Sequence, residues 1–498
     1  MSNDATPVDI QGRPYNRRLM VFVLLIGAFC TILNQTILTT AFPALMSAFD
    51  ISTSTVQWLT TGFLMVNGIM IPISAYLTQR FNTKTLFILA MSVFELGTVM
   101  SWIAPSFAVL FCGRLIQAIG VGINMPLMQN IMLTIYPPEK RGAAMGINGL
   151  VVGLAPAIGP ALSGWVIDSF NWRWLFGMIA PITAIVIIAS IFAVKNVIPN
   201  NKPQLDIVSV VLSTLGFGSM LYGFSSVGDK GWGSPLVIST IIIGAILVIF
   251  LVLRQTKLES PFLEFKVFQS KEFTLATILS SIVMMAMVGV EMVIPLYLQI
   301  IHGMSAFHSG LALLLGSIFM GVMSPVTGQL FDRHGAKRLA MTGMFILSVG
   351  TLPFAFLTRE TPVIYIVFLY AVRMFGISMV MMPVTTAGMN SLPYQLISHG
   401  TAVNNTLRQV ATSVGTAIMV SVLTNVTNSH QPAHSLLKEM PLQYKAQMFN
   451  ATLSGYHAAF WFAVVFSLLG FVLTFFVTSG NGIHLKLDTS GINNGGDK

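Results

Sequence analysis

Residues 146–164 read Gly-Ile-Asn-Gly-Leu-Val-Val-Gly-Leu-Ala-Pro-Ala-Ile-Gly-Pro-Ala-Leu-Ser-Gly and lie inside a longer apolar run. Five glycines and two prolines would destabilise a helix in water. A membrane tolerates such a helix, because neighbouring helices and local adjustments satisfy the freed backbone groups. Glycines without a Cβ let a second helix approach closely, and prolines bend their own helix. The residues that we expect to matter are Gly149, Gly153, Pro156, Gly159, Pro160 and Gly164.

The composition requires lipid as the solvent. Of the 498 residues, 54% are hydrophobic and only 9% are charged, and the mean hydropathy is +0.78. A soluble domain carries about 25% charged residues. The formal net charge of +9 raises nucleic acid as a partner, but the basic residues form no face with interleaved aromatic side chains, so we expect none. No metal-ligand spacing is present, and we expect neither a metal nor a cofactor.

Apolar runs of about 20 residues match the thickness of a bilayer core. The chain has fourteen of them, which predicts an all-α polytopic membrane protein. Their approximate ranges are 19–42, 55–77, 85–104, 107–134, 141–167, 173–194, 205–226, 234–253, 273–299, 307–331, 338–357, 362–389, 399–427 and 455–478.

The basic residues predict the orientation of these spans. Cytoplasmic segments of membrane proteins are enriched in Lys and Arg. If the N-terminus is cytoplasmic, most of the 26 Lys and Arg residues lie on the cytoplasmic side. The outer segments hold Arg173, Lys230, Arg359, Lys438 and Lys445, and the spans hold Arg114, Arg373 and Arg408. We therefore expect both termini in the cytoplasm and the protein in the cell membrane.

The chain repeats itself weakly, with offsets of 253 to 259 residues. The repeated pairs are Leu77-x-x-Arg80-x-x-x-Lys84 with Leu330-x-x-Arg333-x-x-x-Lys337, Arg114 with Arg373, Met125-Pro126 with Met382-Pro383, and Arg141-Gly142-x-Ala144 with His399-Gly400-x-Ala402. Two homologous halves with a site between them explain the pattern. The predicted organisation is a cytoplasmic tail (1–18), a six-helix half (19–195), two inserted helices (196–254), a cytoplasmic linker (255–272), a second six-helix half (273–478) and a cytoplasmic tail (479–498).

Several motifs resemble those of the fourteen-span drug:proton antiporters of the major facilitator superfamily. They are Leu33-Asn34-Gln35-Thr36-Ile37, Gln57-Trp58-Leu59, Arg114 with Gln117, Gly120 and Gly122, the stretch from Gly153 to Gly164, Trp172-Arg173-Trp174-Leu175-Phe176 and Leu205-Asp206. The resemblance covers essentially the whole chain and implies the major facilitator fold. Ala75-Tyr76-Leu77-Thr78-Gln79-Arg80-Phe81 and Asn34 look most like the lincomycin-efflux branch of Gram-positive bacteria.

The sequence departs from the pattern of that family at two places. Asn34 stands where the family has an acid on the first helix. The loop after the second span, with Arg80 and Lys84, has Thr78 in place of the usual Asp. The complete gating-loop motif follows the tenth span instead and includes Asp332, Arg333, Gly335, Lys337 and Arg338. By resemblance, these loops latch helices through an acid and basic residues, so we expect the stronger latch in the second half.

Ionisable residues within spans are costly and usually serve a function. Glu95 and Glu291 lie in mid-span with no Lys or Arg within four residues. A desolvated acid of this kind can bind and release a proton near neutral pH. We expect Glu291 to couple protons and Glu95 to contact cationic drugs, although either acid can instead remain protonated and bonded between helices. Arg114 matches a motif implicated in proton transfer, whereas Arg373 and Arg408 fit either a functional or a purely structural role.

The expected function is export of small amphiphilic drugs, lincosamide-like or cationic, in exchange for protons. Two halves would rock about a central cavity, and we expect a functional monomer. No Lys-Ser/Thr follows the glycine-rich segments, so no nucleotide-hydrolysing enzyme is expected. An alternative is an exporter of a metabolite or signalling molecule with the same fold; few charges in the cavity would favour drugs. A membrane sensor or scaffold would need large soluble domains, which the sequence lacks.

Overall fold

The computed structural model describes residues 7–38, 40–200, 206–258, 261, 263–433 and 440–478. Fourteen of its helical segments are long and apolar enough to cross a membrane. This confirms the predicted fold class. The helices are α1 (Arg17–Thr36), α2 (Phe42–Phe49), α3 (Thr53–Arg80), α4 (Thr83–Trp102), α5 (Phe107–Ile135), α6 (Arg141–Ser169), α7 (Trp174–Gly177), α8 (Ile179–Ala193), α9 (Ile207–Lys230), α10 (Pro235–Gln255), α11 (Lys271–Ile300), α12 (Ala306–His334), α13 (Ala336–Thr351), α14 (Val363–Asn390), α15 (Ile397–Ser429) and α17 (Pro441–Thr474).

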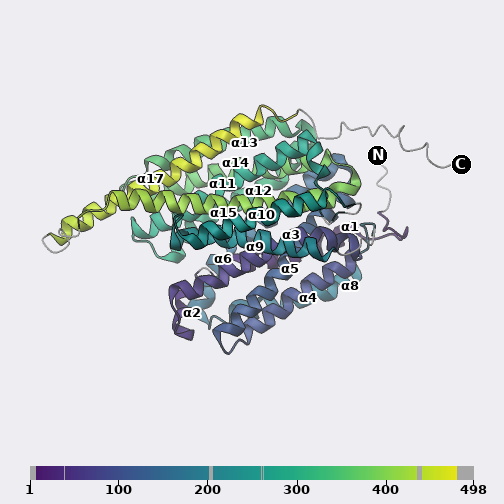
Figure 1. Ribbon diagram of the computed structural model, residues 1–498, viewed down its shortest axis with the longest axis horizontal. Coiled ribbons are helices and arrows are strands. Elements are labelled where there is room, and N and C mark those ends of the chain that lie inside the picture. Colours follow the sequence, from purple (N-terminus) through teal and green to yellow (C-terminus); the bar gives the residue numbers. More distant parts are fainter. Residues whose placement is uncertain are drawn as a thin grey trace.

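Successive long helices run in opposite directions across the bundle (Figure 1). The end where α1 begins and α17 ends is called the termini end below. The predicted tail 479–498 lies outside the described residues, as do parts of the predicted tail 1–18, of the inserted segment 196–254 and of the linker 255–272.

Two predicted spans have wrong boundaries. The first, 19–42, stops at Thr36, and the separate helix α2 follows with a proline in its first turn. Proline is favoured there because its missing N–H would have no helical partner. The last span begins at Pro441 rather than near 455, so α17 extends beyond the bundle (Figure 1). Polar residues in its first turns concealed this extension from a search for apolar runs.

Buried apolar residues form two main cores, one in each half of the bundle. The first is built largely on α1 to α8, and the second on α11 to α17. The inserted helices α9 and α10 lie between the halves in Figure 1. Val227 and Val237 of this pair pack with Ala417 of α15, and Leu221 lies against Gly68 of α3. The inserted pair therefore covers the seam between α3 and α15.

Asp206 precedes α9 at the N-cap position, but its side chain makes no cap hydrogen bond. Instead, Arg254 at the end of α10 donates to both carboxylate oxygens, at 2.8 and 2.9 Å. Hydrogen bonds from Arg254 lower the pKa of Asp206 to about 2. This bidentate pair ties the two inserted helices together at the termini end.

Candidate functional site

A cavity of about 180 Å³ lies between the two halves at the centre of the bundle. Helices α1, α3, α5 and α6 contribute residues from one side, and α11, α14 and α15 from the other. Its lining comprises Gln35, Leu64, Asn67, Ile71, Met125, Pro126, Gln129, Asn148, Val152, Met284, Met382, Asn405, Arg408, Gln409 and Thr412. Because both halves contribute, any rocking of one half against the other reshapes this cavity.

The glycine-rich helix α6 packs along α12 of the opposite half. We call this contact the glycine seam; it consists of Gly142, Gly146, Gly149 and Gly153 of α6 with Gly321 and Gly328 of α12. The four α6 glycines recur every three or four residues and so share one face. A Cβ built on Gly153 would lie 3.1 Å from the Gly321 nitrogen, and one on Gly142 would lie 2.6 Å from the Gly328 oxygen. The backbones therefore meet without intervening side chains.

The other end of the motif packs on α1 within the same half. Pro160 has no N–H, so the carbonyl of Pro156 loses its helical donor. The Thr36 hydroxyl donates to that carbonyl at 3.3 Å. A Cβ on Gly159 would lie 3.2 Å from the Cβ of Thr36. Gly164 again faces α12, where a Cβ would lie 3.1 Å from the ring of Phe307.

Arg114 of α5 is fully buried in the first half and bonds to neutral groups. Its Nη1 donates to the main-chain and side-chain oxygens of Asn34 and, at 2.9 Å, to Oε1 of Gln117. The guanidinium carbon lies 4.1 Å from the centroid of the Phe63 ring. Nε and Nη2 have no hydrogen-bond partner among the described residues. The structure thus brings the predicted residues Arg114 and Asn34 into contact, and no carboxylate of a described residue bonds to the arginine.

Arg373 of α14 is the counterpart of Arg114 in the second half. Its Nη2 donates to the Ala286 carbonyl of α11 at 2.5 Å, and its Nε to Thr351 Oγ1 at 3.2 Å. Arg373 also interacts electrostatically with Glu291 of α11. Each arginine therefore bonds to the first long helix of its own half.

Glu291 of the second half stands at the repeat position that Asn34 holds in the first half, where the acid is missing. Glu291 follows Asn34 by 257 residues, which falls within the offsets of the internal repeat. Glu291 is partly buried, and its side chain makes no hydrogen bond or ion pair within the described residues. It lies seven residues from the cavity residue Met284 and therefore on the same face of α11.

Glu95 lies apart from this arrangement. It is a partly buried residue of α4, a helix that packs against α5, α7 and α8 and contributes nothing to the cavity lining. One of its carboxylate oxygens is buried without a hydrogen-bond partner in the described part of the chain. It interacts electrostatically with Cys30 of α1. The structure therefore places Glu95 and Glu291 in separate halves.

Asp332 joins the two halves at the termini end. Its carboxylate oxygens accept hydrogen bonds from the backbone N–H groups of Gly142 and Ala143, both at 2.9 Å. These N–H groups belong to the first turn of α6, where a helix carries partial positive charge and unpaired donors. Gly335 ends α12 with a φ of +77°, a conformation that favours glycine.

The basic residues of the two predicted gating loops are not part of this latch. They show no side-chain hydrogen bond or ion pair among the residues that the structure describes, and Arg80, Arg333 and Arg338 are exposed. Those with no such contact are Arg80, Lys84, Arg333, Lys337 and Arg338. Their position at the termini end fits the enrichment of Lys and Arg on a cytoplasmic face.

The equivalent place between α3 and α15 has a weaker link. Thr78 donates to the Ser74 carbonyl of its own helix at 2.7 Å and does not cross to the other half. Gln79 Nε2 instead lies 3.0 Å from Nε2 of His399 at the start of α15. His399 Nδ1 accepts from the backbone N–H of Glu264 at 3.1 Å. A neutral amide and an imidazole thus replace the carboxylate.

We expect Asp332→Asn to slow export more than Thr78→Ala does. Asparagine can accept only one of the two backbone hydrogen bonds, and the unsatisfied N–H costs about 1–3 kcal/mol. Thr78→Ala removes only a bond within α3, so near-normal export is expected. The measurement is the drug efflux rate at matched expression. Equal rates for the two variants would show that the carboxylate does not control the conformational change.

Sequence reasoning missed several polar contacts between the halves. Asn405 donates to Gln129 Oε1 at 2.9 Å, and Arg141 Nη1 donates to Asn390 Oδ1 at 2.8 Å. Both pairs connect parts of the chain near the termini end. Amide side chains within apolar runs were the available signal, but a single sequence does not show which of them meet.

The sequence analysis left the role of Arg408 open, as it did for Arg373. The structure places Arg408 in the cavity lining, where it forms no ion pair with any described residue. Its Nη2 lies 3.7 Å from the sulfur of Met284.

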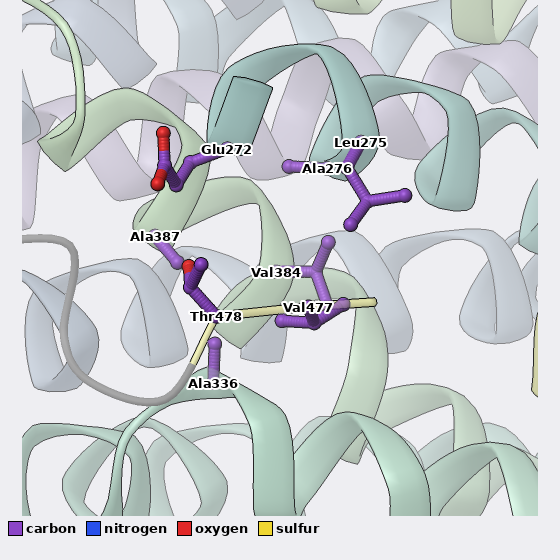
Figure 2. Close-up of a pocket in the computed structure, with 8 residues that line it drawn as sticks. All are labelled: Glu272, Leu275, Ala276, Ala336, Val384, Ala387, Val477 and Thr478. Atoms are coloured by element: carbon purple, nitrogen blue, oxygen red, sulfur yellow. The ribbon is translucent and has the colours of Figure 1, made fainter. Parts of the chain in front are cut away.

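A second, much smaller hollow lies within one half. Figure 2 shows it at the start of α11, with Glu272, Leu275 and Ala276 facing Val384 and Val477. Its volume is about 20 Å³. No residue of the first half lines it, so it lacks the geometry of a site that alternates between halves.

Comparison with known proteins agrees with this architecture. The profile described as Major Facilitator Superfamily matches residues 24–416. The chain is 49% identical over 94% of its length to "Uncharacterized MFS-type transporter YcnB" of Bacillus subtilis, covering 96% of that protein. It is 40% identical to "Lincomycin resistance protein LmrB" of the same species, over 92% of this chain and 95% of that one.

More distant proteins extend the likeness. "Multidrug export protein EmrB" of Escherichia coli is 26% identical over 88% of this chain and 86% of its own. The solved structure of the proton:xylose symporter XylE superposes with a TM-score of 0.63 at 14% identity, over 93% and 96% of the two chains. Two six-helix halves, a cavity between them and these matches lead to one assignment: the chain belongs to the major facilitator superfamily and is a multi-pass membrane transporter.

Proposed function

We propose that the chain is a proton-coupled multidrug efflux antiporter that works by alternating access. It exports small amphiphilic drugs from the cytoplasm, with lincosamide-like compounds as the first candidates, and protons move inward in exchange. It acts as a monomer in the cell membrane, with both termini in the cytoplasm. The names of two relatives, a lincomycin resistance protein and a multidrug export protein, support export of drugs.

The observation that carries the proposal is the position of Glu291. This acid shares a face of α11 with the cavity residue Met284 and interacts with the buried Arg373. A proton on Glu291 therefore changes the charge of a helix that lines the cavity, and it does so close to an arginine of the same half. When two conformations bind this proton with different affinities, a proton gradient shifts the equilibrium between them.

The latch at the termini end supports the alternating step. Asp332 holds the start of α6, and Asn405 bonds to Gln129 in the cavity wall. These bonds close the proposed cytoplasmic side of the cavity. Opening toward the cytoplasm must break them, which gives the two halves distinct bonded and separated arrangements.

The test is transport in proteoliposomes. Purified protein is reconstituted with an imposed pH gradient, and movement of a fluorescent amphiphilic drug is followed with and without an uncoupler. We expect transport that depends on the gradient and stops with the uncoupler. Equal transport without a gradient, or a requirement for ATP, would contradict the proposal. Gradient-driven movement of a metabolite but of no drug would favour the alternative of a metabolite exporter.

A further inference from the structure

Arg408 brings an unpaired positive charge to the wall of the central cavity. Its Nη2 lies 3.7 Å from the sulfur of Met284, a weak acceptor, and its Nε is buried without a hydrogen-bond partner in the described chain. Among the described residues that line the cavity, it is the one charged side chain. A cation at membrane depth is costly without a counter-charge. The cavity is where such a counter-charge can enter.

The acids of the membrane region do not supply it. Glu291 lies two turns, about 10 Å, from Met284 along α11, and it interacts with Arg373. Glu95 lies on α4, outside the cavity. Neither forms an ion pair with Arg408 in the part of the chain that the structure describes.

Neutral side chains make up the rest of the wall. Gln35, Asn148 and Gln409 can donate and accept hydrogen bonds, and the buried side-chain oxygen of Asn67 has no partner among the described residues. These groups can orient a ligand but cannot neutralise a charge. Leu64, Ile71, Met125 and Met382 add apolar surface from both halves. Flexible methionines adapt to ligands of different shape.

We propose that this cavity selects amphiphilic compounds by an electron-rich polar group, and that an oxyanion such as a carboxylate binds most tightly, with Arg408 as its counter-charge. The proposal rests on drug export through this cavity and narrows the class of substrate. A guanidinium forms paired, charge-assisted hydrogen bonds with a carboxylate. A permanently cationic compound finds no acid in the lining and is repelled by Arg408. The cationic drugs that the sequence suggested are therefore the weaker ligands here.

The test is equilibrium binding to the purified full chain in lipid nanodiscs at neutral pH. Three probes share one dansyl-undecyl body and end in a carboxylate, a primary amide or a trimethylammonium group. The variants are Arg408→Gln, Arg408→Lys and, as a matched loss of charge at an exposed site, Arg18→Gln. We expect the native protein to bind the carboxylate about tenfold more tightly than the amide. Arg408→Gln should abolish this preference, Arg408→Lys should keep part of it, and Arg18→Gln should leave it intact.

The amide probe reports whether each variant is still folded, because its binding should not change in Arg408→Gln. Tighter binding of the trimethylammonium probe than of the carboxylate by the native protein would overturn the proposal. A carboxylate preference that survives in Arg408→Gln would also overturn it. So would an Arg408→Gln variant that loses binding of the amide probe along with the carboxylate preference. Binding is measured without a gradient, so its outcome is separate from proton coupling. A preference that depends on Arg408 in a protein without gradient-driven export would refute the antiporter function and leave this site standing.

Discussion

Glu291→Gln is expected to stop gradient-driven export while drug binding persists. Glutamine keeps the size of the side chain but cannot alternate between a charged and a neutral form. Glu291 shares a helix face with the cavity residue Met284 and lies close enough to Arg373 to interact with it. The measurement is drug transport by proteoliposomes under an imposed pH gradient, compared with drug–drug exchange without one. We expect the first to fall to the level of empty liposomes and the second to continue.

Two further variants make this test specific. Glu272→Gln changes an acid in the first turn of the same helix, away from the cavity, and should retain coupled export. Asn34→Asp places an acid beside Arg114, at the position equivalent to Glu291. Added to Glu291→Gln, it should restore part of the coupling if the two positions are interchangeable. Proton release on drug binding that survives in Glu291→Gln and in its double variant with Glu95→Gln would place the coupling group elsewhere.

Gly153→Leu is expected to abolish export although the protein still inserts into the membrane. The new side chain would meet the backbone of Gly321, and its Cβ alone would lie 3.1 Å from that nitrogen. Overpacking of this kind costs about 1–3 kcal/mol, and a backbone neighbour yields less readily than a flexible side chain. Gly159→Leu should also fail, by displacing Thr36 of α1 within the first half.

The measurement is drug resistance of cells that express each variant at equal level in a pump-deficient host. Gly233→Leu is the control, because no atom lies within 4 Å of a Cβ at that position. It should give native resistance. Full resistance from Gly153→Leu would show that transport does not need the close contact of α6 with α12.

The sequence predicted the membrane fold well because its signals are long and repetitive. Apolar runs located the fourteen spans, and the glycine motif of α6 indicated a close helix contact. The predicted boundaries were wrong where a helix continues through polar residues, as in the first turns of α17. Asp206 stands at the N-cap position of α9, but the arginine that binds it lies 48 positions away. No local pattern contains that partner.

The candidate site was predicted only in part, for the same reason. Asn34 and Arg114 were recognised separately, and their hydrogen bond required the fold. Glu95 and Glu291 looked alike as acids in apolar runs, yet Glu95 lies on a helix that does not line the cavity and Glu291 on one that does. The role of Arg408 depends on which helices surround it. Helical periodicity fixes a face of one helix, but it does not identify the helix that the face meets.

The glycine seam bears on how the two halves can move. Helices that interlock through large side chains must shift many rotamers before one can turn against the other. Between α6 and α12, Gly142 faces Gly328 and Gly153 faces Gly321 with backbone against backbone, so a small rotation there meets few torsional barriers. The seam between α3 and α15 differs, because the inserted helices cover it. The two seams between the halves are therefore unlike: in one the backbones of α6 and α12 touch directly, and in the other α9 and α10 cover the contact.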